Sequence, residues 1–147
     1  MLFKKQAMNI IVFLLILLFA YAGSVKLFDY TTFSIQLSKS PLIFDRADQI
    51  ALVLPISEII IAFMLLTDKY RLQGLYLSFF TMLTFTLYLL YMVNFSYYIP
   101  CSCGGILGRM SWNVHIVFNI FFVAISAIGV IIYKTETIPK HAKQLAV

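Results

Sequence analysis

Charged side chains are scarce in this sequence: they make up 12% of its 147 residues, whereas 62% of the residues are hydrophobic. So few charges argue against a soluble domain and indicate a membrane protein. Acidic residues are fewer than basic ones: the sequence has six aspartates and glutamates against eleven lysines and arginines, which gives a net charge of +5. The basic residues lie near the ends of apolar segments, as membrane topology signals do, so their excess argues against nucleic-acid binding.

Internal repeats and low-complexity segments are also absent from the sequence, which instead contains four long apolar runs. The runs cover residues 7–28, 49–66, 74–93 and 114–133. Each is close to the ~20 residues that cross the hydrocarbon core of a bilayer. A spanning segment has no water to bond its backbone, so it must be helical. The sequence predicts an all-α fold, a polytopic membrane four-helix bundle that forms a single domain over residues 1–147.

The connections and their basic residues predict how the spans cross the membrane. The link Asp68–Arg71 is so short that the second and third spans should form an antiparallel hairpin. One predicted side carries Lys4, Lys5, Lys69, Arg71, Lys134, Lys140 and Lys143, and the other carries Lys26, Lys39, Arg46 and Arg109. Because basic residues are enriched in short cytoplasmic segments, both termini should be cytoplasmic. Residues 94–113 should then face the periplasm of a bacterial inner membrane.

The first connection, residues 29–48, has a pattern typical of a short amphipathic helix. Phe33 and Leu37 are four positions apart, with polar residues around them. A helix lying in the membrane interface and ending near Pro41 would place both side chains on one face. An irregular, solvated loop is the alternative interpretation.

The N-terminal segment also has the features of a secretory signal peptide. Lys4 and Lys5 precede an apolar core, and Ala20-Tyr21-Ala22 supplies small residues at a cleavage position. We expect the segment to stay in place as a membrane anchor. Its removal would leave three spans in the same orientation.

The sequence has only two cysteines, Cys101 and Cys103, and one residue separates them in the outward-facing connection. Disulfides are chemically permitted outside the cytoplasm. A bridge across one residue closes a very small ring, and the resulting strain makes it easier to reduce, which suits thiol-disulfide exchange. Two unpaired thiols, or an inert bridge, are the alternatives that remain open.

Glu58 lies near the middle of the second apolar run. A charged acid at that depth costs at least ~2.5 kcal/mol, so Glu58 should be neutral, paired or lining a polar cavity. Because intramembrane acids are functional by default, we predict that Glu58 stores or moves a proton. The alternative is a structural hydrogen bond between helices, for instance to a serine, threonine or asparagine on another span.

His115 and Asn119 are four positions apart at the outer end of the last run, so they should share one helix face. His115 could raise the thiolate fraction of a cysteine in the adjacent connection. Together with Cys101 and Cys103 it could instead hold a soft metal such as Cu(I) or Zn(II). A hydrogen bond from His115 to a carbonyl group is the simplest alternative.

Two further sets of residues are expected to take no part in chemistry. Lys26, near the end of the first run, is expected to extend outward to the membrane interface. The aromatic residues of the third run are expected to face lipid or to pack between helices. They include Phe79, Phe80, Phe85 and Tyr88.

Three short stretches carry a family resemblance: "YAGSVKLFDYTTFSIQLSKSP" after the first span, "PISE" in the second, and "CSCGG" followed by "SWNVHIVFN". Together they resemble the MauE family of methylamine-utilisation membrane proteins, within the wider DoxX-like group. The resemblance covers essentially the whole chain. It implies a four-helix membrane bundle that acts in thiol-disulfide chemistry outside the cytoplasm and helps to mature disulfide-rich exported partners. It places the family's cysteine pair on Cys101 and Cys103, and its intramembrane acid on Glu58.

The sequence departs from that family in one motif. Family members often have an aromatic residue after the glycine that follows the cysteines, whereas here Gly104-Gly105-Ile106 follows. No residue points to methylamine as a substrate. A looser similarity links the chain to the DsbB and vitamin K epoxide reductase groups, which usually carry a second cysteine pair. With two cysteines, this chain cannot relay electrons between two internal pairs.

The leading hypothesis from the sequence is a thiol-disulfide oxidoreductase component of the membrane. Cys101 and Cys103 would exchange with an exported thioredoxin-like or cysteine-rich partner, and a quinone could accept the electrons. His115 would tune thiolate formation, and Glu58 would hold a proton. The second hypothesis is a non-enzymatic membrane subunit or assembly factor with structural or metal-binding cysteines. A third, a transporter organised around Glu58, lacks the broken-helix pairs expected of one.

Overall fold

The computed structural model describes residues 2–95 and 111–144, and all regular secondary structure in these ranges is helical. In chain order, the elements are α1 (Leu2–Phe28), α2 (Tyr30–Ser38), the 3-10 helix η1 (Phe44–Arg46), α3 (Ala47–Leu66), α4 (Arg71–Phe95) and α5 (Trp112–Gln144). Within the described part, four stretches are long and apolar enough to cross a membrane: Phe3–Phe28, Phe44–Leu66, Arg71–Phe95 and Asn113–Thr135. The predicted all-α fold with four membrane-spanning segments is confirmed.

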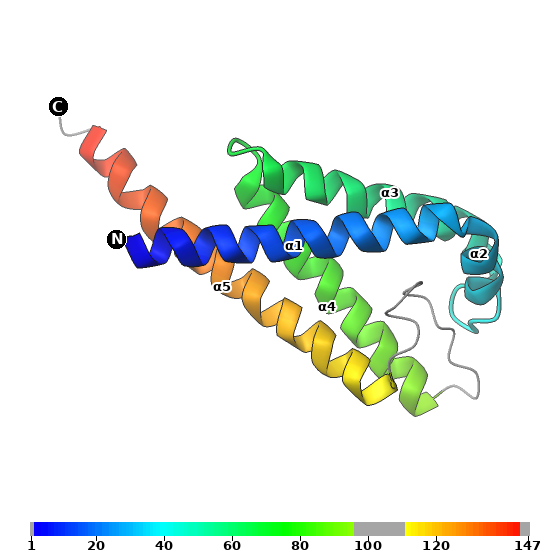
Figure 1. Cartoon of the computed structure of the whole chain (residues 1–147). Coiled ribbons are helices and arrows are strands. Elements are labelled where there is room, and N and C mark those ends of the chain that lie inside the picture. The colour runs from blue at the N-terminus through cyan, green and yellow to red at the C-terminus, as the bar shows by residue number, and fades with distance from the viewer. Residues whose placement is uncertain (1, 96–110, 145–147) are drawn as a thin grey trace.

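The long helices form two antiparallel pairs that cross each other at an angle (Figure 1). α1 packs along α3, and α4 packs along α5. The C-terminal ends of α1 and α4 lie at the same end of the bundle as the short helix α2, which we name the α2 end. The start of α1, the α3–α4 turn and the end of α5 lie at the opposite end. Successive long helices therefore run in opposite directions, as in an up-and-down bundle.

The packing of apolar side chains suits a bundle surrounded by lipid. Leu15, Leu65 and Leu75 are fully buried between the helices and belong to one continuous apolar cluster. Large apolar side chains such as Phe63 and Val117 cover the outside of the same helices. An apolar surface of this extent is unusual for a soluble monomer and is what a membrane requires.

The α3–α4 turn forms the predicted antiparallel hairpin. Arg71 Nη2 lies 2.5 Å from Asp68 Oδ1, and Arg71 Nε donates a hydrogen bond to the carbonyl oxygen of Leu65 at 3.4 Å. Arg71 thus satisfies one of the carbonyl groups that the end of α3 leaves without an intrahelical partner. Because the Asp68 side chain is 86% exposed, its ion pair adds little stability.

Helix α2 confirms the prediction of a short amphipathic helix in the first connection, and excludes the irregular loop for these residues. Phe33 and Leu37 lie on its buried face and pack against Ala47 and Ala51 at the start of α3. The contact fixes the connection between α1 and α3 to the end of the bundle. It also brings α2 next to the polar residues described below.

Candidate functional site

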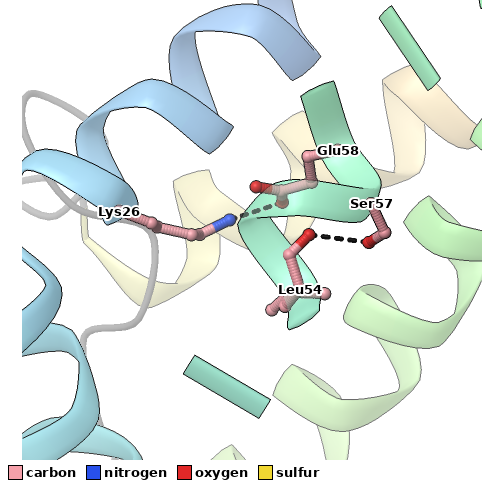
Figure 2. A network of polar contacts seen from close by, with 4 residues as sticks. All are labelled: Lys26, Leu54, Ser57 and Glu58. Atoms are coloured by element: carbon pink, nitrogen blue, oxygen red, sulfur yellow. Dashed lines mark hydrogen bonds and ion pairs between the residues drawn. The ribbon is translucent and has the colours of Figure 1, made fainter. Parts of the chain in front are cut away.

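A lysine and a glutamate form an ion pair inside the bundle (Figure 2). Lys26 of α1 donates a hydrogen bond to Glu58 of α3, with 2.5 Å between Nζ and Oε1. The two side chains are 4% and 1% exposed. An unpaired charge is costly at this depth, so each charge makes the burial of the other tolerable. The prediction that Glu58 is paired or lines a polar cavity is confirmed, and the expectation that Lys26 extends outward is wrong.

The inward direction of Lys26 follows from the geometry of an α-helix. Side chains on a helix lean toward its N-terminus, and Lys26 lies in the last turn of α1. Its long side chain therefore runs back into the bundle rather than out to the interface. The ammonium nitrogen also lies 5.2 Å from the centroid of the Phe85 ring and 5.8 Å from that of Phe33. These cation–π contacts compensate part of the hydration that Lys26 has lost.

Gly23 sets the close approach of α1 and α3 one turn before Lys26. A Cβ atom added at Gly23 would lie 2.9 Å from the carbonyl oxygen of Pro55 and 2.9 Å from Cγ1 of Ile59. It would also lie 3.3 Å from Cβ of Glu58. No side chain fits in this space without moving the helices apart, so the glycine holds the two charges in register.

Three hydroxyl groups of α3 and α4 bond within their own helices. Ser57 Oγ donates to the carbonyl oxygen of Leu54 at 2.6 Å (Figure 2). Ser78 and Thr86 of α4 each donate to a carbonyl oxygen one turn earlier, at 2.7 Å. This arrangement satisfies each hydroxyl where water is absent. Glu58 does make a hydrogen bond to another helix, as the structural alternative expected, but its partner is Lys26 of α1 rather than a serine, threonine or asparagine. The proton-carrying role of Glu58 stays a prediction.

The second carboxylate oxygen of Glu58, Oε2, is buried and has no hydrogen-bond partner among the residues that the structure describes. Glu58 lines a cavity of about 30 Å³ together with Lys26, His115 and Asn119. Six apolar residues complete its wall, and we name it the polar cavity after these four side chains. A cavity of this volume with several polar partners has room for an ordered water molecule. Polar side chains from α1, α3 and α5 thus meet at one small space inside the bundle.

His115 and Asn119 of α5 are 5% and 4% exposed and lie one turn apart. The prediction that they share a face is confirmed, because both line the cavity at Glu58. The segment that precedes α5 carries Cys101 and Cys103, which lie outside the described residues. The roles predicted for the two cysteines, and for His115 beside them, therefore stay predictions.

Within residues 2–95 and 111–144, no group of three or more His, Cys, Asp or Glu side chains is placed to hold a metal ion. The metal set suggested by the sequence consists of Cys101, Cys103 and His115, and only His115 belongs to the described part. This alternative therefore also stays a prediction.

Sequence reasoning missed Lys26 as the partner of Glu58, although the sequence contains a signal for it. Lys26 and Glu58 are the only lysine, arginine, aspartate or glutamate residues within the four predicted apolar runs. Two isolated charges of opposite sign in adjacent spans are best accommodated as a pair.

Comparison with known proteins identifies a family for the chain. The family model described as "Methylamine utilisation protein MauE" matches residues 4–132, which cover nearly all of the four spans and both cysteines. No curated protein and no solved structure matches the chain.

Proposed function

This chain belongs to the MauE family, and from that membership and the buried polar site we propose that it is a thiol-disulfide redox component of the bacterial cytoplasmic membrane. Cys101 and Cys103 are the exchanging pair in this proposal. The partner is an exported thioredoxin-like or cysteine-rich protein. Both termini face the cytoplasm, and the α2 end faces the periplasm.

The observation that carries the proposal is the position of the polar cavity relative to the cysteine-bearing segment. His115 lines the cavity together with Lys26 and Glu58, and it lies in the first turn of α5. The segment with Cys101 and Cys103 leads directly into this turn. His115 thus follows the thiol pair closely in the chain, and the polar cavity links it to Lys26 and Glu58. An imidazole near a thiol can raise its thiolate fraction, which favours thiol-disulfide exchange.

The proposed exchange balances without a further reactant. The thiolate of one cysteine attacks a sulfur atom of the partner's disulfide, which forms a mixed disulfide and releases the partner's other sulfur as a thiolate. The second cysteine of this chain, as its thiolate, then attacks the mixed disulfide. The chain is left with a Cys101–Cys103 disulfide, and the partner with a dithiol. Two electrons and two protons pass to the partner, and the reverse sequence passes them back.

Glu58 and His115 handle protons in this scheme. Each thiol must lose its proton before its sulfur can attack, and each departing thiolate takes one up. Glu58 can accept a proton on Oε2 while Oε1 keeps its contact with Lys26. The hydrogen bond from Lys26 thus holds the carboxyl group in place whether Glu58 is charged or protonated, which allows Glu58 to store a proton.

The proposal is tested by trapping the redox state of the cysteines in membranes. Acid quenching followed by alkylation with a maleimide of high mass separates the dithiol from the disulfide on a gel. We expect Cys101 and Cys103 to move between both states when cells are exposed to a reductant or an oxidant. We also expect one of Cys101→Ser and Cys103→Ser to accumulate a mixed disulfide with an exported protein, and the double variant to accumulate none.

Two results would contradict the proposal. One is a trapping pattern that is the same with and without reductant, which would indicate an inert bridge or permanently free thiols. The other is stoichiometric copper or zinc in the purified protein that is lost in Cys103→Ser, which would favour the assembly factor with metal-binding cysteines.

A further inference from the structure

The polar cavity contains a buried acceptor that calls for a hydrogen-bond donor. Oε2 of Glu58 has no hydrogen-bond partner among the described residues, and the side chain is 1% exposed. A buried polar atom without a hydrogen bond costs about 1–3 kcal/mol, and more when it is charged. Most buried polar atoms have a partner, either in the protein or in ordered water. The burial of Oε2 therefore points to a bound molecule that donates a hydrogen bond to it.

The volume and the wall of the polar cavity limit that molecule to a very small one. The cavity measures about 30 Å³, and a water molecule occupies about 10–15 Å³ of such a volume. The polar part of the wall comes from three helices, with Lys26 on α1, Glu58 on α3, and His115 and Asn119 on α5. A buried water typically makes about three hydrogen bonds. The cavity thus has room for water and enough polar groups to hold it.

Asn119 offers the molecule a neutral partner in addition to Glu58. Its side chain is only 4% exposed, although its amide carries two N–H donors and a carbonyl acceptor. An asparagine buried in a spanning helix is stabilised when it hydrogen-bonds to a group outside its own helix. A water molecule between Asn119 and Glu58 would satisfy both side chains at once.

We propose that the polar cavity binds a water molecule that donates a hydrogen bond to Glu58 Oε2 and is held in place by the amide of Asn119. Asn119 is a positioning residue in this site, because it acts on Glu58 through the water. A proton reaches a buried oxygen along a hydrogen bond, and the water supplies that bond to the proton store. This use of the water rests on the proposed function, whereas the site itself does not depend on the cysteines.

Other small occupants fit the polar cavity less well. A cation would lie beside the ammonium of Lys26, and an anion would lie beside the carboxylate of Glu58, so each would be repelled by a charge already present. An apolar molecule would leave Oε2 without a partner. Water carries no net charge and donates hydrogen bonds, so it avoids all three costs.

The site is tested by a crystal structure of the full chain in a lipidic mesophase, at a resolution that shows ordered water. We expect a density peak within hydrogen-bond distance of Glu58 Oε2 and of the Asn119 amide. Asn119→Leu removes the amide and should lose the peak. Asn94→Leu is the matched control, because Asn94 is exposed on α4 and does not line the cavity, and it should keep the peak. An empty cavity in the parent chain, or an unchanged peak in Asn119→Leu, would overturn the proposal.

Infrared spectroscopy in lipid nanodiscs gives a second readout, because the carboxyl band of Glu58 responds to its hydrogen bonds. The band is identified by its loss in the double variant Lys26→Met, Glu58→Leu, which removes both charges together. Ala22→Val fills the cavity and leaves Asn119 intact, since Ala22 is a buried part of the same wall. We expect the band to shift in Ala22→Val and in Asn119→Leu, because both lose the water. Ala124→Val, at an exposed position of α5, should leave the band in place.

A shift in only one of the two cavity variants would overturn the proposal. A shift in Asn119→Leu alone would mean that the amide bonds to Glu58 directly, and a shift in Ala22→Val alone would mean that Asn119 does not hold the water. Both measurements can be repeated in a chain with Cys101→Ser and Cys103→Ser, where we expect the same peak and the same band. Failure of the water site is therefore distinguishable from failure of the exchange at the cysteines.

Discussion

Lys26 and Glu58 are 32 positions apart in the chain, and their side chains meet in the interior of the bundle as a hydrogen-bonded ion pair. Neither residue has another charged residue in its own apolar run. The pair therefore favours the same stagger of α1 and α3 as the close contact at Gly23, because another register would leave two charges buried alone.

The first prediction concerns the stability of the ion pair. Lys26→Met and Glu58→Leu should each lower the free energy of unfolding by about 3–5 kcal/mol, because each leaves the other charge buried without a partner. The double variant should recover most of this loss, since it replaces the pair with apolar side chains. Circular dichroism during denaturant titration in mild detergent measures the effect.

A second ion pair in the same chain serves as the control for this experiment. Asp68→Asn removes the partner of Arg71 in the exposed α3–α4 turn, and it should cost at most about 1 kcal/mol. If the double variant of Lys26 and Glu58 were as unstable as the two single variants combined, the argument from uncompensated charge would fail.

The next prediction concerns Gly23. Gly23→Ala should destabilise the bundle by about 1–3 kcal/mol, because the new methyl group overlaps the Pro55 carbonyl oxygen and pushes α1 away from α3. Ser24→Ala, at the next position of the same helix, should leave the stability close to that of the parent. Thermal unfolding of both variants in detergent measures the difference, and an unchanged midpoint for Gly23→Ala would show that the helices do not meet as closely as described.

The orientation in the membrane gives a third prediction. In a chain with Cys101→Ser and Cys103→Ser, a single cysteine is introduced either by Lys39→Cys beside α2 or by Asp68→Cys in the α3–α4 turn. A membrane-impermeant maleimide should label the first in intact cells, and the second only after permeabilisation. Both positions are exposed, so access depends on the side of the membrane. The reverse pattern would mean that the α2 end faces the cytoplasm.

Much of the fold could be predicted from the sequence because hydrophobic runs long enough to span a bilayer have few structural solutions. The four spans and the α3–α4 hairpin followed from run length and loop length. Helix α2 followed from the spacing of Phe33 and Leu37. The helices extend beyond the predicted runs, to Leu2 in α1 and to Gln144 in α5, because a helix can continue past the hydrocarbon where its residues become polar.

The candidate site was only partly predictable. The burial of Glu58 and the shared face of His115 and Asn119 follow from single-helix geometry, and both were predicted. The partner of Glu58 depends on how far α1 and α3 are staggered along each other, which hydrophobicity does not encode. That stagger is set by the contact of Gly23 with Pro55. The sequence alone therefore predicts that Lys26 extends to the membrane interface, and only the packing of α1 against α3 shows that it pairs with Glu58.

Lys26 forms part of the wall of two separate spaces, the polar cavity at His115 and a larger apolar cavity that Phe33 and Phe85 also line. A molecule there that draws the ammonium toward α4 would weaken its attraction for Glu58. A proton on Glu58 weakens the same attraction, although the hydrogen bond at Oε1 can persist. Thermodynamic reciprocity requires that each event favour the other by the same factor. Binding of a molecule in the apolar cavity and protonation of Glu58 would thus be coupled through Nζ of Lys26.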